Sequence, residues 1–230
     1  YPTVLAVASL ATEYDDDAAE RIALAAHPGL TERSMWSATL ELHDLAARST
    51  GLASAPEIAL NVAQAAEKLG RYDEALAILH RVRRVASGVA SARTWNQIGN
   101  VERWLGHFED ALGHYRQAIE IAAEHGDASI EGRATGNHAD TLRVLARYDL
   151  AEAGYDRALE LAAHSADELN RRIVLTNRAL LWTATGRLDD AERSLRSVIE
   201  EAGERAMPSQ RIGLAFIAEA RGDDVAAARL

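Results

Sequence analysis

A small residue recurs along the sequence, and other small residues lie at fixed distances before and after each copy. Five such anchors stand 36, 40, 40 and 36 residues apart, at Gly70, Gly106, Ala146, Gly186 and Gly222. Alanine follows each anchor by five residues, at Ala75, Ala111, Ala151, Ala191 and Ala227. Another small residue precedes each anchor by seven, at Ala63, Gly99, Ala139, Ala179 and Ala215. Spacing of this length predicts a repeat array rather than one globular core.

One repeat can be followed residue by residue over 95–122, WNQIGNVERWLGHFEDALGHYRQAIEIA. Helical spacing predicts one packing stripe before the turn and one after it: Trp95, Ile98, Gly99 and Glu102, then Phe108, Ala111, Tyr115 and Ala118. Gly106 can take the left-handed backbone conformation that ends the first helix. Small residues let two antiparallel helices cross closely, and the aromatic rings fill the space around the crossing. The segment therefore predicts a helical hairpin.

This pattern resembles the tetratricopeptide repeat. The resemblance covers residues 55–205 best, and it is strongest to the long-repeat subgroup found in kinesin light chains, bacterial peptide-pheromone receptors and sensor regions of signal-transduction ATPases. It implies an all-α fold, a right-handed superhelical solenoid of antiparallel helix hairpins with about five to six repeats. Such hairpins stack because one alone cannot bury its apolar faces.

We expect one continuous solenoid over residues 1–230, with degenerate repeats in 1–49, clear repeats in 55–205 and a truncated repeat in 207–230. Helices are expected over 3–13, 15–26 and 31–49, with a break at His27-Pro28-Gly29 and with Thr31 or Ser34 as a cap. Further helices are expected to start near Pro56 and Pro208. Both ends fall inside a repeat, which favours a fragment of a longer protein.

The third of these helices can be aligned with the second helix of the clear repeat. This alignment places Ala38, Leu42 and Leu45 at the repeat positions of Ala111, Tyr115 and Ala118.

Composition excludes several function classes. The chain has a net charge of −10 and no cysteine, so we expect no nucleic-acid binding by this segment and no disulfide framework. It contains no apolar run of about 18 residues and no signal peptide, which favours a cytoplasmic protein that does not bind a membrane. Lys68 is the one lysine among 25 basic residues, and this bias indicates a high-GC, actinobacterial genome.

In stacked hairpins of this kind the first helix of each repeat lines the inner groove. The residues nine before the anchors are Asn61, Gln97, Asn137, Asn177 and Gly213. An amide both donates and accepts hydrogen bonds, so a row of amides can pair with the backbone of an extended peptide. The resemblance implies that asparagine in this place clamps a ligand backbone; the alternative is that it only bonds the neighbouring helix.

Arginines form a second row in the predicted groove. Arg93 and Arg133 stand thirteen residues before their anchors, Arg103 and Arg143 three before, and Asn100 and Asp140 six before. Guanidinium groups there favour an acidic peptide or a C-terminal carboxylate as ligand, unless they pair with Asp140 or nearby glutamates instead. The predicted peptide-binding residues are Asn61, Gln97, Asn100, Arg103, Arg133, Asn137, Asp140, Arg143 and Asn177.

Two tryptophans lie near this groove. Trp182 is expected in the core, four residues before Gly186. Trp104, two residues before Gly106, is either a ligand platform or a packing residue.

Catalytic signals are lacking in the sequence. No phosphate loop, nucleophile elbow or pair of catalytic carboxylates occurs, and the eight histidines are scattered, so we expect no enzyme activity, cofactor or metal. The favoured function is a non-catalytic scaffold that holds an extended protein or peptide segment in its groove. The alternative is the sensor region of a larger signal-transduction ATPase or transcriptional regulator, since LELHDLAARS at 40–49 resembles a segment that precedes such arrays. Self-association through the end helices is a third possibility.

Overall fold

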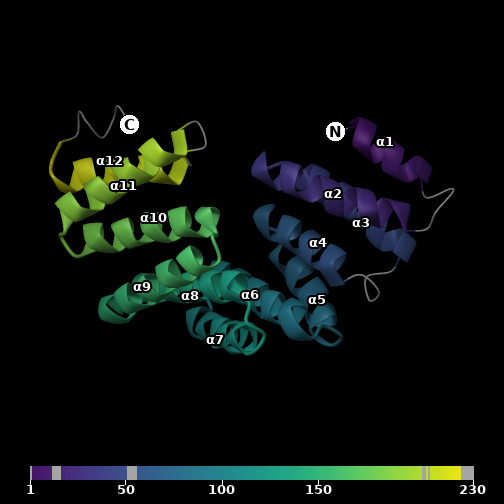
Figure 1. Ribbon diagram of the computed structural model, residues 1–230, viewed down its shortest axis with the longest axis horizontal. Coiled ribbons are helices and arrows are strands. Elements are labelled where there is room, and N and C mark those ends of the chain that lie inside the picture. The colour runs from purple at the N-terminus through teal and green to yellow at the C-terminus, as the bar shows by residue number, and fades with distance from the viewer. Residues whose placement is uncertain (1, 12–16, 51–55, 204–205, 207, 224–230) are drawn as a thin grey trace. The chain divides into compact units, whose positions relative to one another are not determined.

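The protein folds into helices joined by short turns (Figure 1). The computed structural model describes residues 2–11, 17–50, 56–203, 206 and 208–223, and these residues form no strand. The helices are α1 (Pro2–Ala11), α2 (Ala18–Glu32), α3 (Trp36–Thr50), α4 (Pro56–Lys68), α5 (Tyr72–Arg83), α6 (Gly88–Trp104), α7 (Phe108–Glu124), α8 (Ala128–Val144), α9 (Tyr148–His164), α10 (Glu168–Ala184), α11 (Leu188–Ala202) and α12 (Pro208–Ala220). The predicted all-α fold class is confirmed.

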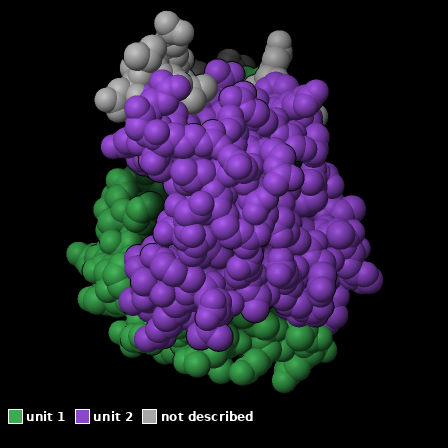
Figure 2. Space-filling model, turned by 90° about the vertical axis from the view of Figure 1, so that its left-hand side faces the viewer, with its two compact units in different colours: residues 1–125 green, residues 126–230 purple. Residues whose placement is uncertain are grey.

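The helices divide into two compact units, coloured separately in Figure 2. Unit 1 comprises residues 1–125 and unit 2 residues 126–230. In unit 1, α2 pairs with α3, α4 with α5 and α6 with α7; in unit 2, α8 pairs with α9 and α10 with α11. The first helices of successive hairpins also touch, α4 against α6 and α8 against α10. Each unit is therefore a stack of helical hairpins.

The turn at Gly106 shows why the anchors are small. Gly106 has a φ of 85°, its N–H donates to the Arg103 carbonyl at 3.1 Å, and the His107 N–H donates to the Glu102 carbonyl at 2.9 Å. This is the left-handed helix ending in which glycine avoids a Cβ clash. Ala146 takes the same conformation with a φ of 56°, although it has a Cβ.

The crossing of α6 and α7 requires glycine for a different reason. A Cβ on Gly99 would lie 2.6 Å from Cε1 of Tyr115, so the aromatic ring packs directly on the backbone of α6. Tyr115 itself is fully buried. The small residue seven before the anchor and the large one nine after it form one packing unit, as the sequence predicts.

The predicted register of the first hairpin is wrong by one residue. Its turn lies at Ser34, which has a φ of 53°, and the Met35 N–H donates to the Leu30 carbonyl as the equivalent groups do at Gly106. The residues at the places of Ala111, Tyr115 and Ala118 are therefore Thr39, His43 and Ala46, not Ala38, Leu42 and Leu45. Since Ser34 is not glycine, the sequence lacks the residue that indicates this turn in most other repeats.

The predicted break at His27-Pro28-Gly29 is also wrong, because α2 continues through Pro28 to Glu32. Its buried stripe of Ala19, Ala23 and Leu30 extends past the proline, whose ring is exposed. Packing of this stripe outweighs the missing N–H. Thr31 lies inside the helix and is no cap; its hydroxyl donates to the His27 carbonyl at 3.0 Å.

Other predicted elements agree more closely with the structure. The helix expected over 3–13 is α1, and the helices expected near Pro56 and Pro208 begin at those residues, as α4 and α12. Ala227, the last of the alanines that follow the anchors by five residues, lies outside the described residues.

Candidate functional site

The nine predicted binding residues lie on first helices of both units, at the expected repeat positions. Unit 1 carries four of them on α4 and α6: Asn61, Gln97, Asn100 and Arg103. Unit 2 carries five on α8 and α10: Arg133, Asn137, Asp140, Arg143 and Asn177. The two sets differ in their burial and in their partners, so each is described within its own unit.

Asn61 is buried against the preceding hairpin. Only 3 % of it is exposed, and its Nδ2 lies 3.2 Å from Nε2 of His43. The other ring nitrogen, Nδ1 of His43, lies 2.8 Å from the Thr39 carbonyl oxygen. A carbonyl only accepts, so Nδ1 of His43 carries the proton and Nε2 accepts from Asn61. This amide bonds a neighbouring helix in the structure.

His43 also packs against His27, with the rings T-shaped and their centroids 5.0 Å apart. In the other hairpins this crossing joins a small residue to a tyrosine or leucine. Burial lowers the pKa of His43 to about 4. Burial also lowers the pKa of His27, and the positive charge of Arg93 lowers it further. Both imidazoles are therefore neutral near neutral pH, which a shared buried contact requires.

The two amides on α6 have different surroundings. Gln97 is 8 % exposed, and its Oε1 is buried without a hydrogen-bond partner among the described residues. Asn100 is half-buried, and its Oδ1 accepts a hydrogen bond from the Tyr115 hydroxyl at 2.9 Å. Arg103, one turn further on, holds its guanidinium 5.1 Å from the centre of the Trp104 ring.

The equivalent positions in unit 2 carry an ion pair. Nε and Nη2 of Arg143 donate to Oδ1 of Asp140 at 2.9 and 2.8 Å, and the Tyr155 hydroxyl donates to the same oxygen at 3.2 Å. Asp140 is 7 % exposed. Burial alone would lower the pKa of Arg143, but the Asp140 carboxylate more than compensates and raises it. Burial raises the pKa of Tyr155, as does the neighbouring Asp140. The group is a satisfied buried network.

Arg133 is paired as well. Its Nε donates to Oδ2 of Asp167 at 2.9 Å, and its Nη2 lies 2.8 Å from the same oxygen in an ion pair. Asp167 caps α10 by accepting from the Asn170 N–H at 3.0 Å. Burial would raise the pKa of Asp167, but the Asn170 N–H and the Arg133 guanidinium together lower it. Arg133 and Arg143 thus each have a carboxylate partner.

Asn137 and Asn177 occupy the same repeat position on the neighbouring helices α8 and α10, and both are half-buried. The Asn137 carbonyl accepts from the Thr141 hydroxyl within α8. The Asn177 side chain makes no hydrogen bond to another described residue. Unit 2 therefore presents two amides in equivalent positions on touching helices, next to two arginines.

The two tryptophans near the groove differ in exposure. Trp182 is half-buried against the core of unit 2, and its Nε1 donates to Oε1 of Glu152 at 3.0 Å, in line with the expected packing role. Trp104 is 54 % exposed. Its Nε1 donates to Oε1 of Glu67 at 3.3 Å. Glu67 is a polar residue that the sequence analysis missed, because only the packing of α4 against α6 brings it to Trp104.

The described residues include no group of three or more His, Cys, Asp or Glu that could hold a metal ion. Nor does any described helix combine the length and apolar character needed to cross a membrane.

A tetratricopeptide repeat family model matches residues 54–124, which span α4 to α7. This part of the chain carries tetratricopeptide repeats. A search of curated proteins found no match. The repeat fold accounts for the hairpins, the positive-φ turns and the small residues at the helix crossings.

Solved structures share the fold at low sequence identity. A Rap protein complexed with competence and sporulation factor superposes with a TM-score of 0.77 at 14 % identity, over 92 % of this chain and 62 % of the other. BtubC (BKLC) from P. vanneervenii gives 0.63 at 18 % identity, over 85 % of each chain. A putative kinesin light chain with tetratricopeptide-like repeats, from Podosopora anserina, gives 0.57 at 14 %, over 77 % and 92 %. These likenesses show the fold alone, and the repeats over residues 54–124 support a protein-interaction role.

The segment at 40–49 that resembles part of a signal-transduction ATPase lies within α3. Its Leu42 and His43 are fully buried in the first hairpin. Packing therefore accounts for these residues, and the segment on its own does not favour a larger regulator.

Proposed function

We propose that the protein is a non-catalytic scaffold that holds an extended peptide segment of a partner protein against the first helices of its hairpins. The observation that carries this is the pair Asn137 and Asn177, which lie partly exposed at one repeat position on touching helices. An asparagine side chain carries both a donor and an acceptor of the kind that pair with a peptide backbone. An extended peptide that crosses α8 and α10 would meet both.

The charges beside these amides bear on the type of peptide. The Arg133 side chain is 49 % exposed, whereas that of its partner Asp167 is 9 % exposed, so a ligand carboxylate would bond the exposed part of the guanidinium without displacing Asp167. The Arg143 side chain is less accessible, since only 22 % of it is exposed. An acidic side chain or a terminal carboxylate is therefore expected to bind at Arg133 rather than at Arg143.

Selection of short random peptides displayed on phage tests the proposal. The wild-type chain should retain peptides that the double variant Asn137→Ala, Asn177→Ala binds at least about tenfold more weakly. Ser197→Ala, an exposed change on the outer helix α11, should leave their binding unchanged. Equal binding by the double variant, with unchanged helicity and melting, would exclude these two amides as the site.

The same peptides, made with free and amidated C-termini, test the carboxylate. If Arg133 receives it, amidation and Arg133→Gln should weaken binding to a similar degree, and the two changes together should add little more. Additive losses would place the carboxylate elsewhere.

A further inference from the structure

Trp104 is unusual among the tryptophans of this chain. Trp36, Trp95 and Trp182 are half-buried, whereas 54 % of Trp104 is exposed. The repeat does not require an aromatic residue there, since the same position two before the anchor holds Lys68, Val144 and Ala184 in other repeats. Packing of the hairpins therefore does not account for this side chain.

The Trp104 ring is nevertheless held in one orientation. Its Nε1 donates to Oε1 of Glu67 at 3.3 Å, and the Glu67 side chain is only 3 % exposed. The same oxygen accepts from Nζ of Lys68 at 2.9 Å. The Arg103 guanidinium lies over the ring, 5.1 Å from its centre. A large aromatic side chain that is already ordered loses little conformational entropy when a partner covers it.

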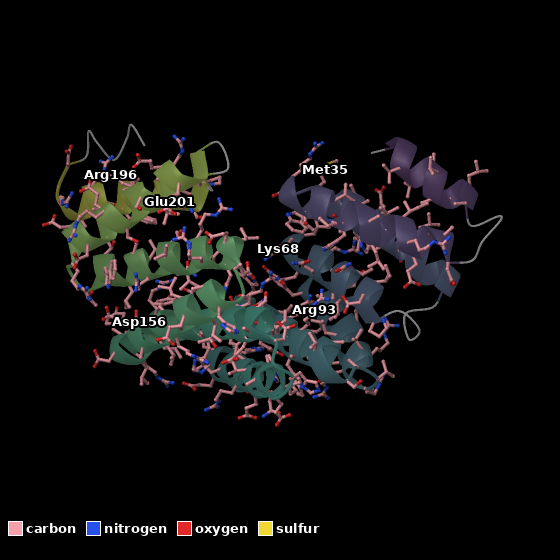
Figure 3. All side chains as sticks on the ribbon, viewed as in Figure 1. Met35, Lys68, Arg93, Asp156, Arg196 and Glu201 are labelled. Carbon is pink, nitrogen blue, oxygen red and sulfur yellow. The ribbon has the colours of Figure 1, made fainter. Side chains whose placement is uncertain are left out.

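Further apolar and cationic groups lie at the same two helix ends. Leu69 and Leu105, which directly follow α4 and α6, are each 38 % exposed. Figure 3 marks Lys68 at the end of α4. We call Lys68, Leu69, Arg103, Trp104 and Leu105 the Trp104 surface. It combines three exposed apolar side chains with two cations.

We propose that the Trp104 surface binds a protein segment in which an aromatic or branched aliphatic side chain is flanked by aspartate or glutamate. The apolar side chain would cover the indole and the leucines, where tryptophan commonly contributes much of the binding energy. The flanking carboxylates would bond Lys68 and Arg103. Glu67 pairs with Lys68 and offsets one of the two cations, which leaves Lys68, Arg103 and Glu67 together with one net positive charge to attract a carboxylate.

An acidic protein segment fits better than nucleic acid. The chain has a net charge of −10, which opposes binding to a phosphate backbone, while two local cations suffice for a short peptide. This site lies in unit 1 and does not depend on the amides proposed to bind a peptide in unit 2.

The experiment uses the full 230-residue chain and short random peptides displayed on phage. Peptides retained by the wild type but lost with Trp104→Ala should be enriched in carboxylates next to Phe, Trp, Leu or Ile. Synthetic copies should bind Trp104→Ala at least about tenfold more weakly. Trp104→Phe, which keeps a ring but loses the bond to Glu67, should bind with intermediate affinity.

Three controls make the result specific. Val144→Ala changes the equivalent residue of the next repeat, which is 45 % exposed, and should not alter binding. Lys68→Gln and Arg103→Gln leave the indole in place and should reduce both the affinity and its salt dependence. Asn137→Ala with Asn177→Ala should bind these peptides as the wild type does, which separates the two proposed sites.

The proposal is overturned if no selected peptide depends on Trp104, or if the dependent peptides lack carboxylates. It is also overturned if Lys68→Gln and Arg103→Gln bind normally. Melting curves of all variants show whether lost binding comes from lost structure, and the glutamine variants test the surface even if Trp104→Ala lowers stability.

Discussion

Acid is expected to weaken unit 1 through the contact of His43 with His27. The folded-state pKa of His43 is about 4, against an ordinary value of 6.5 for an exposed imidazole. The unfolded chain therefore takes up the proton first. Stability from the neutral His43 is fully present above the unfolded pKa and is lost as the pH falls through 6.5 toward 4.

The size of the effect follows from the shift. Lowering the pH from about 7 to about 5 should remove about 2 kcal/mol of the free energy of unfolding through His43 alone. His27 acts in the same direction, since its pKa is lowered as well. Protonation would also place an N–H of His43 against Nδ2 of Asn61, so that two donors face each other. The carboxylates with lowered pKa values, such as Glu152, titrate below this range.

Hydrogen exchange measured by mass spectrometry can locate the loss. Between these pH values the amides of residues 18–50, in α2 and α3, should lose protection more than those of α8 and α9, after correction for the intrinsic exchange rate. Urea titration of the whole chain gives the matching free energies.

A matched variant identifies the groups responsible. His27→Ala with His43→Leu recreates the alanine–leucine crossing that Ala63 and Leu79 form in the next hairpin. It should abolish most of the acid sensitivity of α2 and α3, while His114, whose pKa burial also lowers, stays in place. The same loss of protection in this variant as in the wild type would refute the explanation.

Four further substitutions test the packing, a turn and the buried polar network. Gly99→Ala should destabilise the protein by about 1–3 kcal/mol because its Cβ would meet Tyr115, whereas Gly113→Ala, with open space, should stabilise it by up to about 1 kcal/mol in urea titrations. Ala146→Gly should raise the free energy of unfolding by about 1 kcal/mol, and the melting temperature with it, because glycine takes the positive φ of this turn without strain. A lower melting temperature would contradict this. Asp140→Ala removes an acceptor used by a guanidinium and a phenol, and should cost about 3 kcal/mol in urea titrations; a change below about 1 kcal/mol would show that the network contributes little.

Much of the repeat could be read from local sequence because each requirement is local. A turn that ends a helix in the left-handed region favours a residue such as Gly106, and a close crossing favours a small one such as Gly99. Both recur at fixed offsets, so the hairpins, their turns and their first helices were predictable. Ser34 meets the same turn requirement without glycine, and there the predicted register was wrong by one residue.

The burial and the partners of the predicted binding residues depend on the tertiary structure. Asn61 and Asn177 share a repeat position, yet Asn61 is buried against His43 while Asn177 is partly exposed. Arg133 bonds to Asp167, which lies 34 residues later in the sequence. The sequence determined the repeat, its turns and the helix faces, because neighbours along the chain set backbone conformation and periodicity. Only the tertiary structure decided which polar side chains are paired and which face solvent, because burial and charge pairing depend on residues that the fold brings together.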